Sequence, residues 1–136
     1  MTNKLQMAAD IFTCAAGEFK NVHWNVRGDE FDTMHDVAQR YYERASKDAD
    51  ELSEWTVGMT GTAGSPNEAA TRCSWPPADE STFDRNSAVA KFTDLILVLV
   101  GTLETLLNEG PALGNYVATA LEFWAKEFRY FNNRRQ

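Results

Sequence analysis

Three observations predict an all-α protein, a four-helix bundle with one long crossover. Apolar residues recur at three- and four-residue steps along four long segments, as in amphipathic helices. The connections inside the first and second pairs of segments are short, whereas the connection between the two pairs is long. No segment shows the alternating pattern of a strand. With 136 residues, we expect a single domain over residues 1–136.

The first two helices are predicted from their apolar stripes. The first spans about residues 3–24 and the second about residues 31–58. Between them "NVRGDE" breaks the pattern, and Gly28 can take the left-handed conformation that a tight connection often needs. The first stripe consists of Leu5, Ala8, Phe12, Ala15, Phe19 and Val22, and the second of Phe31, Met34, Ala38, Tyr41, Ala45, Ala49, Leu52 and Met59.

The crossover and the last two helices follow. From 58 to about 81 the chain is rich in Gly, Thr, Ser and Pro, with one or two helical turns possible in "NEAATRC". A third helix is predicted over about 83–109, with Ser81 or Thr82 as its N-cap and "EGP" at its end. A fourth, over about 114–132, has a broad aromatic side. This connectivity is that of the ferritin-like group. The aromatic side is formed by Tyr116, Ala120, Phe123, Trp124, Phe128 and Phe131.

The composition bears on the class of function. With 43% hydrophobic and 24% charged residues, the chain is ordinary for a globular protein. Its net charge of −7 argues against a general nucleic-acid surface, which usually carries a basic excess. The first ten residues lack the features of a signal peptide, and "LILVLVG" is far shorter than the ~18 apolar residues of a membrane span. We therefore expect a cytoplasmic protein with no membrane association.

The two cysteines, Cys14 and Cys73, lie far apart and form no C-x-x-C pair. Such a pair is weak evidence for a disulfide or a zinc site. Two free thiols, as is usual in a cytosolic chain, are the expected state.

Four polar side chains share one flank of the second helix, beside its apolar stripe. With Phe31 at zero and ~100° per residue, His35 falls at about 40°, Gln39 at about 80°, Asp50 at about 100° and Glu54 at about 140°. Asp50 and Glu54 are one turn apart and can share a cation. His35 lies about 22 Å along the axis from Asp50, so one ion cannot touch both within one chain. A two-fold dimer with this helix antiparallel to its copy would bring them together.

Both histidines of the chain, His23 and His35, stand at the ends of "HWNVRGDEFDTMH". A helical hairpin closed by "NVRGDE" can bring them together as one end of a metal site. The motif, followed by carboxylates, resembles the Dps-like mini-ferritins, whose hallmark is H-W-N-x-R-G, an aromatic residue, and a second His twelve residues after the first. The matching residues are His23, Trp24, Asn25, Arg27, Gly28, Phe31, His35, Asp50 and Glu54.

The resemblance implies a function. Such proteins assemble as hollow dodecamers, oxidise Fe(II) with peroxide or oxygen between two-fold related subunits, and store the ferric product, which protects against peroxide stress. Carried over, His23 and His35 would be iron ligands from one subunit, with Asp50 and Glu54 from its partner. Trp24 would pack close to the iron. The resemblance implies no catalytic residue beyond the metal ligands.

One departure from the family lies at the site. The family usually has an aspartate four residues after the second His, where this chain has Gln39. Glutamine is neutral and a weaker oxygen ligand, so we expect weaker or single-iron binding and slower oxidation. This keeps a second function open: a Dps-like shell or partner-binding protein without efficient oxidation. Asp32 forms a D-x-x-H pair with His35 and offers another oxygen, although a role at the helix N-terminus is favoured.

The other departure concerns DNA. Family members that bind DNA often carry a lysine-rich tail, but here only "MTNK" precedes the first helix and "NNRRQ" ends the sequence. Twelve acidic subunits would repel phosphates unless Arg134 and Arg135 cluster. DNA binding is therefore not expected.

Overall fold

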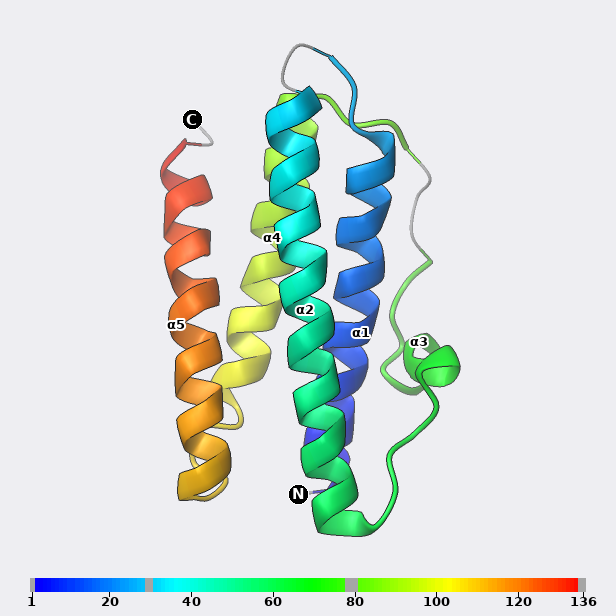
Figure 1. Ribbon diagram of the computed structural model, residues 1–136, viewed down its shortest axis with the longest axis vertical. Coiled ribbons are helices and arrows are strands. Elements are labelled where there is room, and N and C mark those ends of the chain that lie inside the picture. Colours follow the sequence, from blue (N-terminus) through cyan, green and yellow to red (C-terminus); the bar gives the residue numbers. More distant parts are fainter. Residues whose placement is uncertain (1, 29–30, 78–80, 135–136) are drawn as a thin grey trace.

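The structure of the chain, a computed structural model, describes residues 2–28, 31–77 and 81–134. Four long helices lie side by side, and a short helical segment lies within the crossover (Figure 1). The predicted all-α four-helix bundle is confirmed, as are the helical turns expected in the crossover. The elements are α1 (Thr2–Asn25), α2 (Phe31–Thr60), η1 (Pro66–Glu68), α3 (Ala69–Arg72), α4 (Arg85–Glu104) and α5 (Pro111–Arg134).

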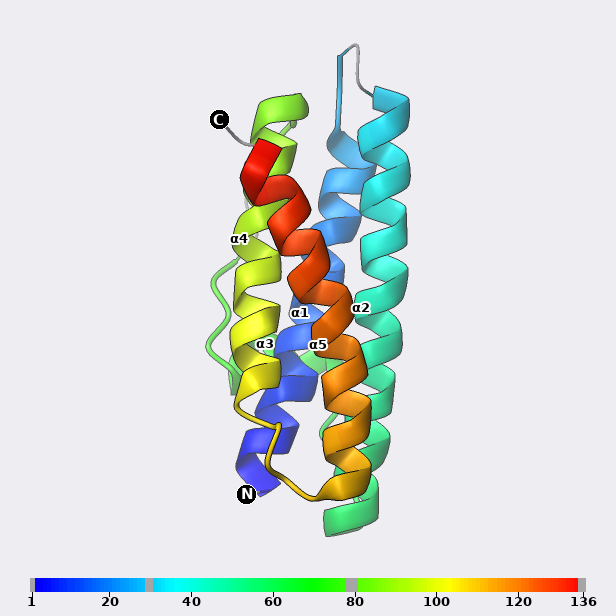
Figure 2. The same cartoon turned by 90° about the vertical axis from the view of Figure 1, so that its left-hand side faces the viewer.

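The helix directions explain why the crossover is long. α1 and α5 run one way along the bundle, and α2 and α4 run the other way (Figures 1 and 2). Because α2 and α4 point in the same direction, the chain between them must return along the bundle before α4 begins. That returning segment passes along the outside of α1 and carries α3.

The core lies between the four long helices and is built around aromatic rings. Trp124 of α5 stacks on Phe19 of α1, with ring centroids 5.8 Å apart and an interplanar angle of 7°, and Tyr41 and Phe92 pack around the same pair. All four side chains are fully buried. The predicted stripe of α1 is buried along its whole length. In α2 the ends of the predicted stripe are exposed, because Phe31 and Met59 each expose 39% of their surface.

The ends of α4 differ from the prediction. Its N-cap is Asp84, not Ser81 or Thr82: the Asp84 carboxylate accepts a hydrogen bond from the Ser87 N–H at 2.8 Å, and the Ser87 hydroxyl lies 3.0 Å from the Asp84 N–H. These reciprocal bonds form a capping box, which satisfies helix N–H groups that would otherwise lack partners. The helix ends at Glu104, before the predicted "EGP", and residues 105–108 form turns.

α4 is also the helix, among the described residues, whose length and composition would allow it to cross a membrane, with a mean hydropathy of 1.4 in its most apolar window. Its apolar side chains, however, supply much of the core of the bundle. Phe92, Ile96 and Leu99 are fully buried against the other helices. α4 is therefore a core helix.

A buried carboxylate ties α2 to α5. Asp48 is fully buried, and it accepts hydrogen bonds from the Tyr116 hydroxyl and from Trp124 Nε1, the latter at 2.8 Å. Arg44 Nε, one turn earlier on α2, lies 3.2 Å from both Asp48 oxygens. Burial and the bond to Asp48 raise the pKa of the Tyr116 hydroxyl. Because a buried charge is tolerated only when paired and hydrogen-bonded, these three donors fix the α2–α5 contact.

The turn after α1 is joined to the segment just before α4. Val26 and Phe83 form a parallel β-bridge, in which the Arg27 N–H donates to the Phe83 carbonyl at 2.7 Å and the Phe83 N–H to the Asn25 carbonyl at 3.0 Å. Gly28 follows with φ of 97°, the left-handed conformation expected of it. The bridge therefore fixes the end of the segment that carries His23.

Candidate metal centre

The hairpin of α1 and α2 brings the two histidines together, as predicted. His23 lies in the last turn of α1 and His35 in the second turn of α2. Their rings stack with centroids 3.6 Å apart and an interplanar angle of 22°. Both side chains are half-buried. Two imidazoles are thus held in one place by two helices and a short turn.

Backbone carbonyls face the Nδ1 atom of both rings. His23 Nδ1 lies 3.0 Å from the carbonyl oxygen of His35, and His35 Nδ1 lies 2.7 Å from the carbonyl oxygen of His23. A carbonyl oxygen can only accept, so each ring carries a proton on Nδ1. In the neutral ring this leaves the Nε2 lone pair available, which is how a metal-binding histidine is usually oriented by a second hydrogen bond.

Aromatic and basic side chains surround the pair. Phe31 stacks on His35 at 5.0 Å, and Tyr42 meets His23 edge-on at 5.3 Å. Lys20 Nζ lies 5.2 Å from the centre of the Tyr42 ring and 6.0 Å from that of Trp24. Trp24 itself is 64% exposed, so in the single chain it covers little of its own core.

The two predicted carboxylates lie on the exposed side of α2. Asp50 and Glu54 are both exposed, and neither makes a hydrogen bond or ion pair with another described residue. Gln39 is half-exposed one turn after His35 and likewise has no hydrogen bond to a described residue. Within the described part of one chain, no group of three or more His, Cys, Asp and Glu side chains is close enough to hold a metal ion. The predicted ligand set is therefore not assembled by one chain alone.

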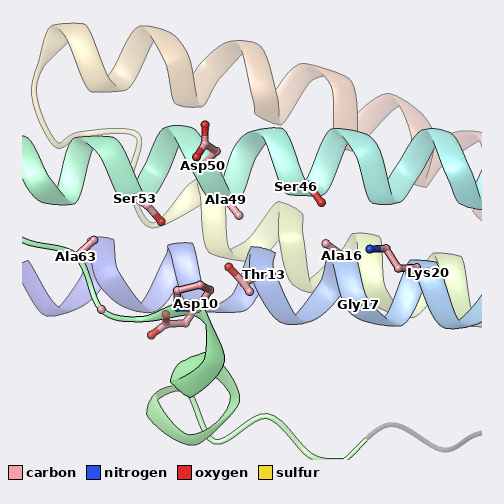
Figure 3. Close-up of a pocket in the computed structure, with 12 residues that line it drawn as sticks. Asp10, Thr13, Ala16, Gly17, Lys20, Ser46, Ala49, Asp50, Ser53 and Ala63 are labelled. Carbon is pink, nitrogen blue, oxygen red and sulfur yellow. The ribbon is translucent and has the colours of Figure 1, made fainter.

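A groove lies between α1 and α2 beside Asp50 (Figure 3). It has a volume of about 540 Å³ and opens between the two helices and the start of the crossover. Its walls are mostly small side chains, with Asp10, Lys20 and Asp50 as charged exceptions. The small residues include Thr13, Ala16 and Gly17 of α1 and Ser46, Ala49 and Ser53 of α2.

Sequence reasoning missed the neighbours of the histidines. Neither Tyr42 nor Lys20 was singled out from the sequence. Both lie at helical spacing from the histidines, since Lys20 is three residues before His23 and Tyr42 is seven residues after His35. That spacing is the signal that places them on the same side of their helices.

Structural comparison places the chain among known folds. Antigen TpF1 from Treponema pallidum superposes with a TM-score of 0.90 at 17% identity, covering 99% of this chain and 90% of that one. A Dps protein from Bacillus brevis gives 0.87 at 19% identity, and Dps from Staphylococcus aureus 0.87 at 18%, each covering 99% of this chain and 94% of the other. No protein-family model and no curated protein sequence matches. At these identities the likeness establishes the fold: the chain has the Dps-like fold, a ferritin-like four-helix bundle.

Proposed function

We propose that this protein is an iron-binding mini-ferritin, which oxidises Fe(II) at a site shared between two subunits and stores ferric iron in a hollow dodecameric cage. The observation that carries the proposal is the stacked pair of His23 and His35, whose Nδ1 protons are engaged by backbone carbonyls. With both Nδ1 atoms bonded to carbonyls, the Nε2 nitrogens remain for a ligand, and imidazole nitrogen suits a borderline cation such as Fe(II).

The carboxylates supply the other half of the proposed site. Asp50 and Glu54 are exposed, one turn apart, and bound to no described cation. Carboxylate oxygens stabilise the ferric product better than the ferrous substrate, because Fe(III) is the harder ion. Each Fe(II) ion gives up one electron to peroxide or dioxygen, and the role of the protein is to bind and orient the iron.

Sharing between chains follows from the length of α2. His35 and Asp50 are about 22 Å apart along one helix, so the two ends meet only across a two-fold axis with antiparallel α2 helices. This pairing would also bring Phe31 of one chain near Val57 of the other. Both are exposed apolar side chains, at 39% and 46%, and Val57 lies on the same flank as the carboxylates. The small side chains of the groove between α1 and α2 would permit close approach of a partner.

A complementation experiment tests both the ligands and their sharing. The variants His35→Ala and Glu54→Ala are each expected to lose Fe(II) oxidation, followed as ferric absorbance after anaerobic loading and peroxide addition. When the two variants are unfolded and refolded together, random pairing should restore about a quarter of the wild-type sites, since half of the dimers are mixed and each has one intact site. Glu104→Gln, an exposed acid on α4, is the matched control and should oxidise iron like wild type. No recovery on mixing would contradict a shared site, and full activity of both single variants would contradict the ligand assignment.

Gln39 favours a second candidate, a Dps-like shell or partner-binding protein without efficient oxidation. The side chain stands one turn after His35, where a carboxylate would add a third oxygen ligand and a negative charge. The variant Gln39→Asp separates the candidates. If the protein is a mini-ferritin weakened at this position, the wild type oxidises Fe(II) at a measurable rate and Gln39→Asp oxidises it faster. A shell protein shows no wild-type oxidation above the His35→Ala background.

A further inference from the structure

One face of α1 binds the crossover through two charged contacts. Arg72, the last residue of α3, donates from Nε and Nη2 to the two oxygens of Asp10, at 2.9 and 2.8 Å. Two turns further along α1, Trp75 Nε1 donates to Glu18 at 2.5 Å, and Lys91 Nζ of α4 lies 2.6 Å from the other Glu18 oxygen. Asp10 and Glu18 are both buried. These contacts hold the segment from Arg72 to Trp75 against α1.

The two cysteines meet midway between those contacts. Cys14 lies one turn from each acid, and its Sγ is 4.0 Å from Sγ of Cys73. The backbone of the crossover is bent to allow this: Ser74 has φ of 55°, which is uncommon for a residue with a side chain. The Cys73 N–H donates to the Ala69 carbonyl at 3.1 Å and the Trp75 N–H to the Ala70 carbonyl at 2.9 Å, and these bonds hold the bend. No disulfide joins the two cysteines in the structure, and their thiols are in contact.

We propose that Cys14 and Cys73 are a dithiol that peroxide converts to an intrachain disulfide, locking the crossover to α1. A disulfide needs the sulfurs about 2 Å apart, so the pair must close by about a further 2 Å, within reach of side-chain rotation and a small shift of the four-residue α3. Formation of this disulfide needs no metal and no residue of the proposed iron site, so this inference is independent of the proposed function.

The chemistry balances with one peroxide per pair. A Cys73 thiolate attacks one peroxide oxygen, the O–O bond breaks, and a sulfenic acid and one water form after proton uptake. Sγ of Cys14 then attacks the sulfenic sulfur, its proton leaves with the hydroxyl group as a second water, and the S–S bond forms. Two thiols are oxidised and one peroxide is reduced to two waters.

The surroundings of Cys14 assign the order of these steps. Burial raises the pKa of the Cys14 thiol to about 12, and the neighbouring Cys73, Asp10 and Glu18 act in the same direction. Cys14 therefore stays protonated near neutral pH and is the poorer first nucleophile, since the thiolate is the reactive form. It serves as the resolving thiol.

Peroxide treatment of metal-free full-length protein tests the proposal. The expected result is loss of both titratable thiols, a monomer mass lower by two hydrogen atoms, and a tryptic peptide pair that joins Cys14 to Cys73 and separates on reduction. The melting temperature should rise by about 10 °C on oxidation and return with a reducing agent. Cys14→Ser and Cys73→Ser, which change one atom each, should show neither the linked peptides nor the rise. Disulfides between chains, or sulfinic acid on both cysteines without linkage, or no loss of thiols at a peroxide excess, would overturn the proposal.

Discussion

Asp48 and Asp50 lie two residues apart on α2, but they differ in burial and in hydrogen-bond partners. Asp48 is fully buried and receives hydrogen bonds from Tyr116, Trp124 and Arg44. Asp50 is exposed, as is Glu54 one turn later, and neither has a polar partner among the described residues. A carboxylate with all its partners inside the fold holds the fold together, whereas one without partners is available to a ligand.

The largest effect is expected at Asp48. Asp48→Ala should lower the free energy of unfolding by about 3 kcal/mol, because the buried Trp124 N–H and the Arg44 guanidinium lose their acceptor. Asp50→Ala, the same change on the exposed side, should stay within about 0.5 kcal/mol of wild type. Urea denaturation at one fixed protein concentration measures both. Equal losses of stability in the two variants would contradict the different roles of Asp48 and Asp50.

A smaller effect is expected from removing one donor. Tyr116→Phe should cost about 1.5 kcal/mol near neutral pH, since a hydrogen bond to a charged acceptor is lost. The pKa of Tyr116 is raised in the folded state, so its stabilising contribution is complete below its ordinary pKa of about 10 and is lost as pH rises further. The wild type should therefore lose stability above about pH 10 more steeply than Tyr116→Phe. Parallel alkaline profiles, measured by denaturation at several pH values, would contradict this role.

Asp84 is an intermediate case, since it is exposed but has partners. Backbone and side-chain hydrogen bonds from Ser87 lower the pKa of Asp84. Its contribution is therefore present above the ordinary pKa of about 3.9 and is lost as pH falls through the lowered folded value. Asp84→Asn should keep the cap and flatten the acid side of the stability profile, whereas Asp84→Ala should lower the melting temperature at neutral pH as well. If Asp84→Ala has the melting temperature of wild type at neutral pH, the hydrogen bonds of this exposed carboxylate do not stabilise the fold.

The smallest effect carries the opposite sign. Asp50 and Glu54 are like charges at i and i+4, a spacing that destabilises a helix by a few tenths of a kcal/mol. In metal-free protein Glu54→Gln should therefore raise the free energy of unfolding by about 0.3 kcal/mol, while Glu104→Gln on α4 serves as the control. Calorimetry in the presence of a chelator measures the change. A clear loss of stability in Glu54→Gln would mean that this carboxylate has a structural partner after all.

Patterns local in the sequence predicted much of the fold. The apolar stripes gave the four long helices, because 3.6-residue periodicity is a property of each helix alone. The stripes failed at Phe31 and Met59, at the ends of α2, where the bundle no longer covers the helix. The cap of α4 was assigned to the wrong residue because Ser81, Thr82 and Asp84 are all good capping residues, and only the reciprocal bond from Ser87 selects Asp84.

The contact between the two histidines could be predicted because it, too, is local in the sequence. The contact of His23 with His35 follows from a short hairpin, so the sequence contains the information for it. The crossover contacts do not follow from any local pattern. Asp10 and Arg72 lie in segments far apart in the sequence, and nothing near either one indicates the other. The role of Asp48 could not be predicted either. In the sequence it is one of several acids on α2, and only the structure shows its donors Tyr116 and Trp124 on α5.

The bridge between Val26 and Phe83 has a consequence for the order of folding. The α1–α2 hairpin is closed by a short turn, whereas the bridge joins two residues that are separated in the sequence by all of α2 and the crossover. Closing a long loop costs more entropy and comes later than closing a short one. A chain that has formed only its first hairpin therefore already carries both imidazoles side by side. The end of their turn becomes fixed when α4 docks, and the amides of Arg27 and Phe83 should then gain protection from hydrogen exchange together.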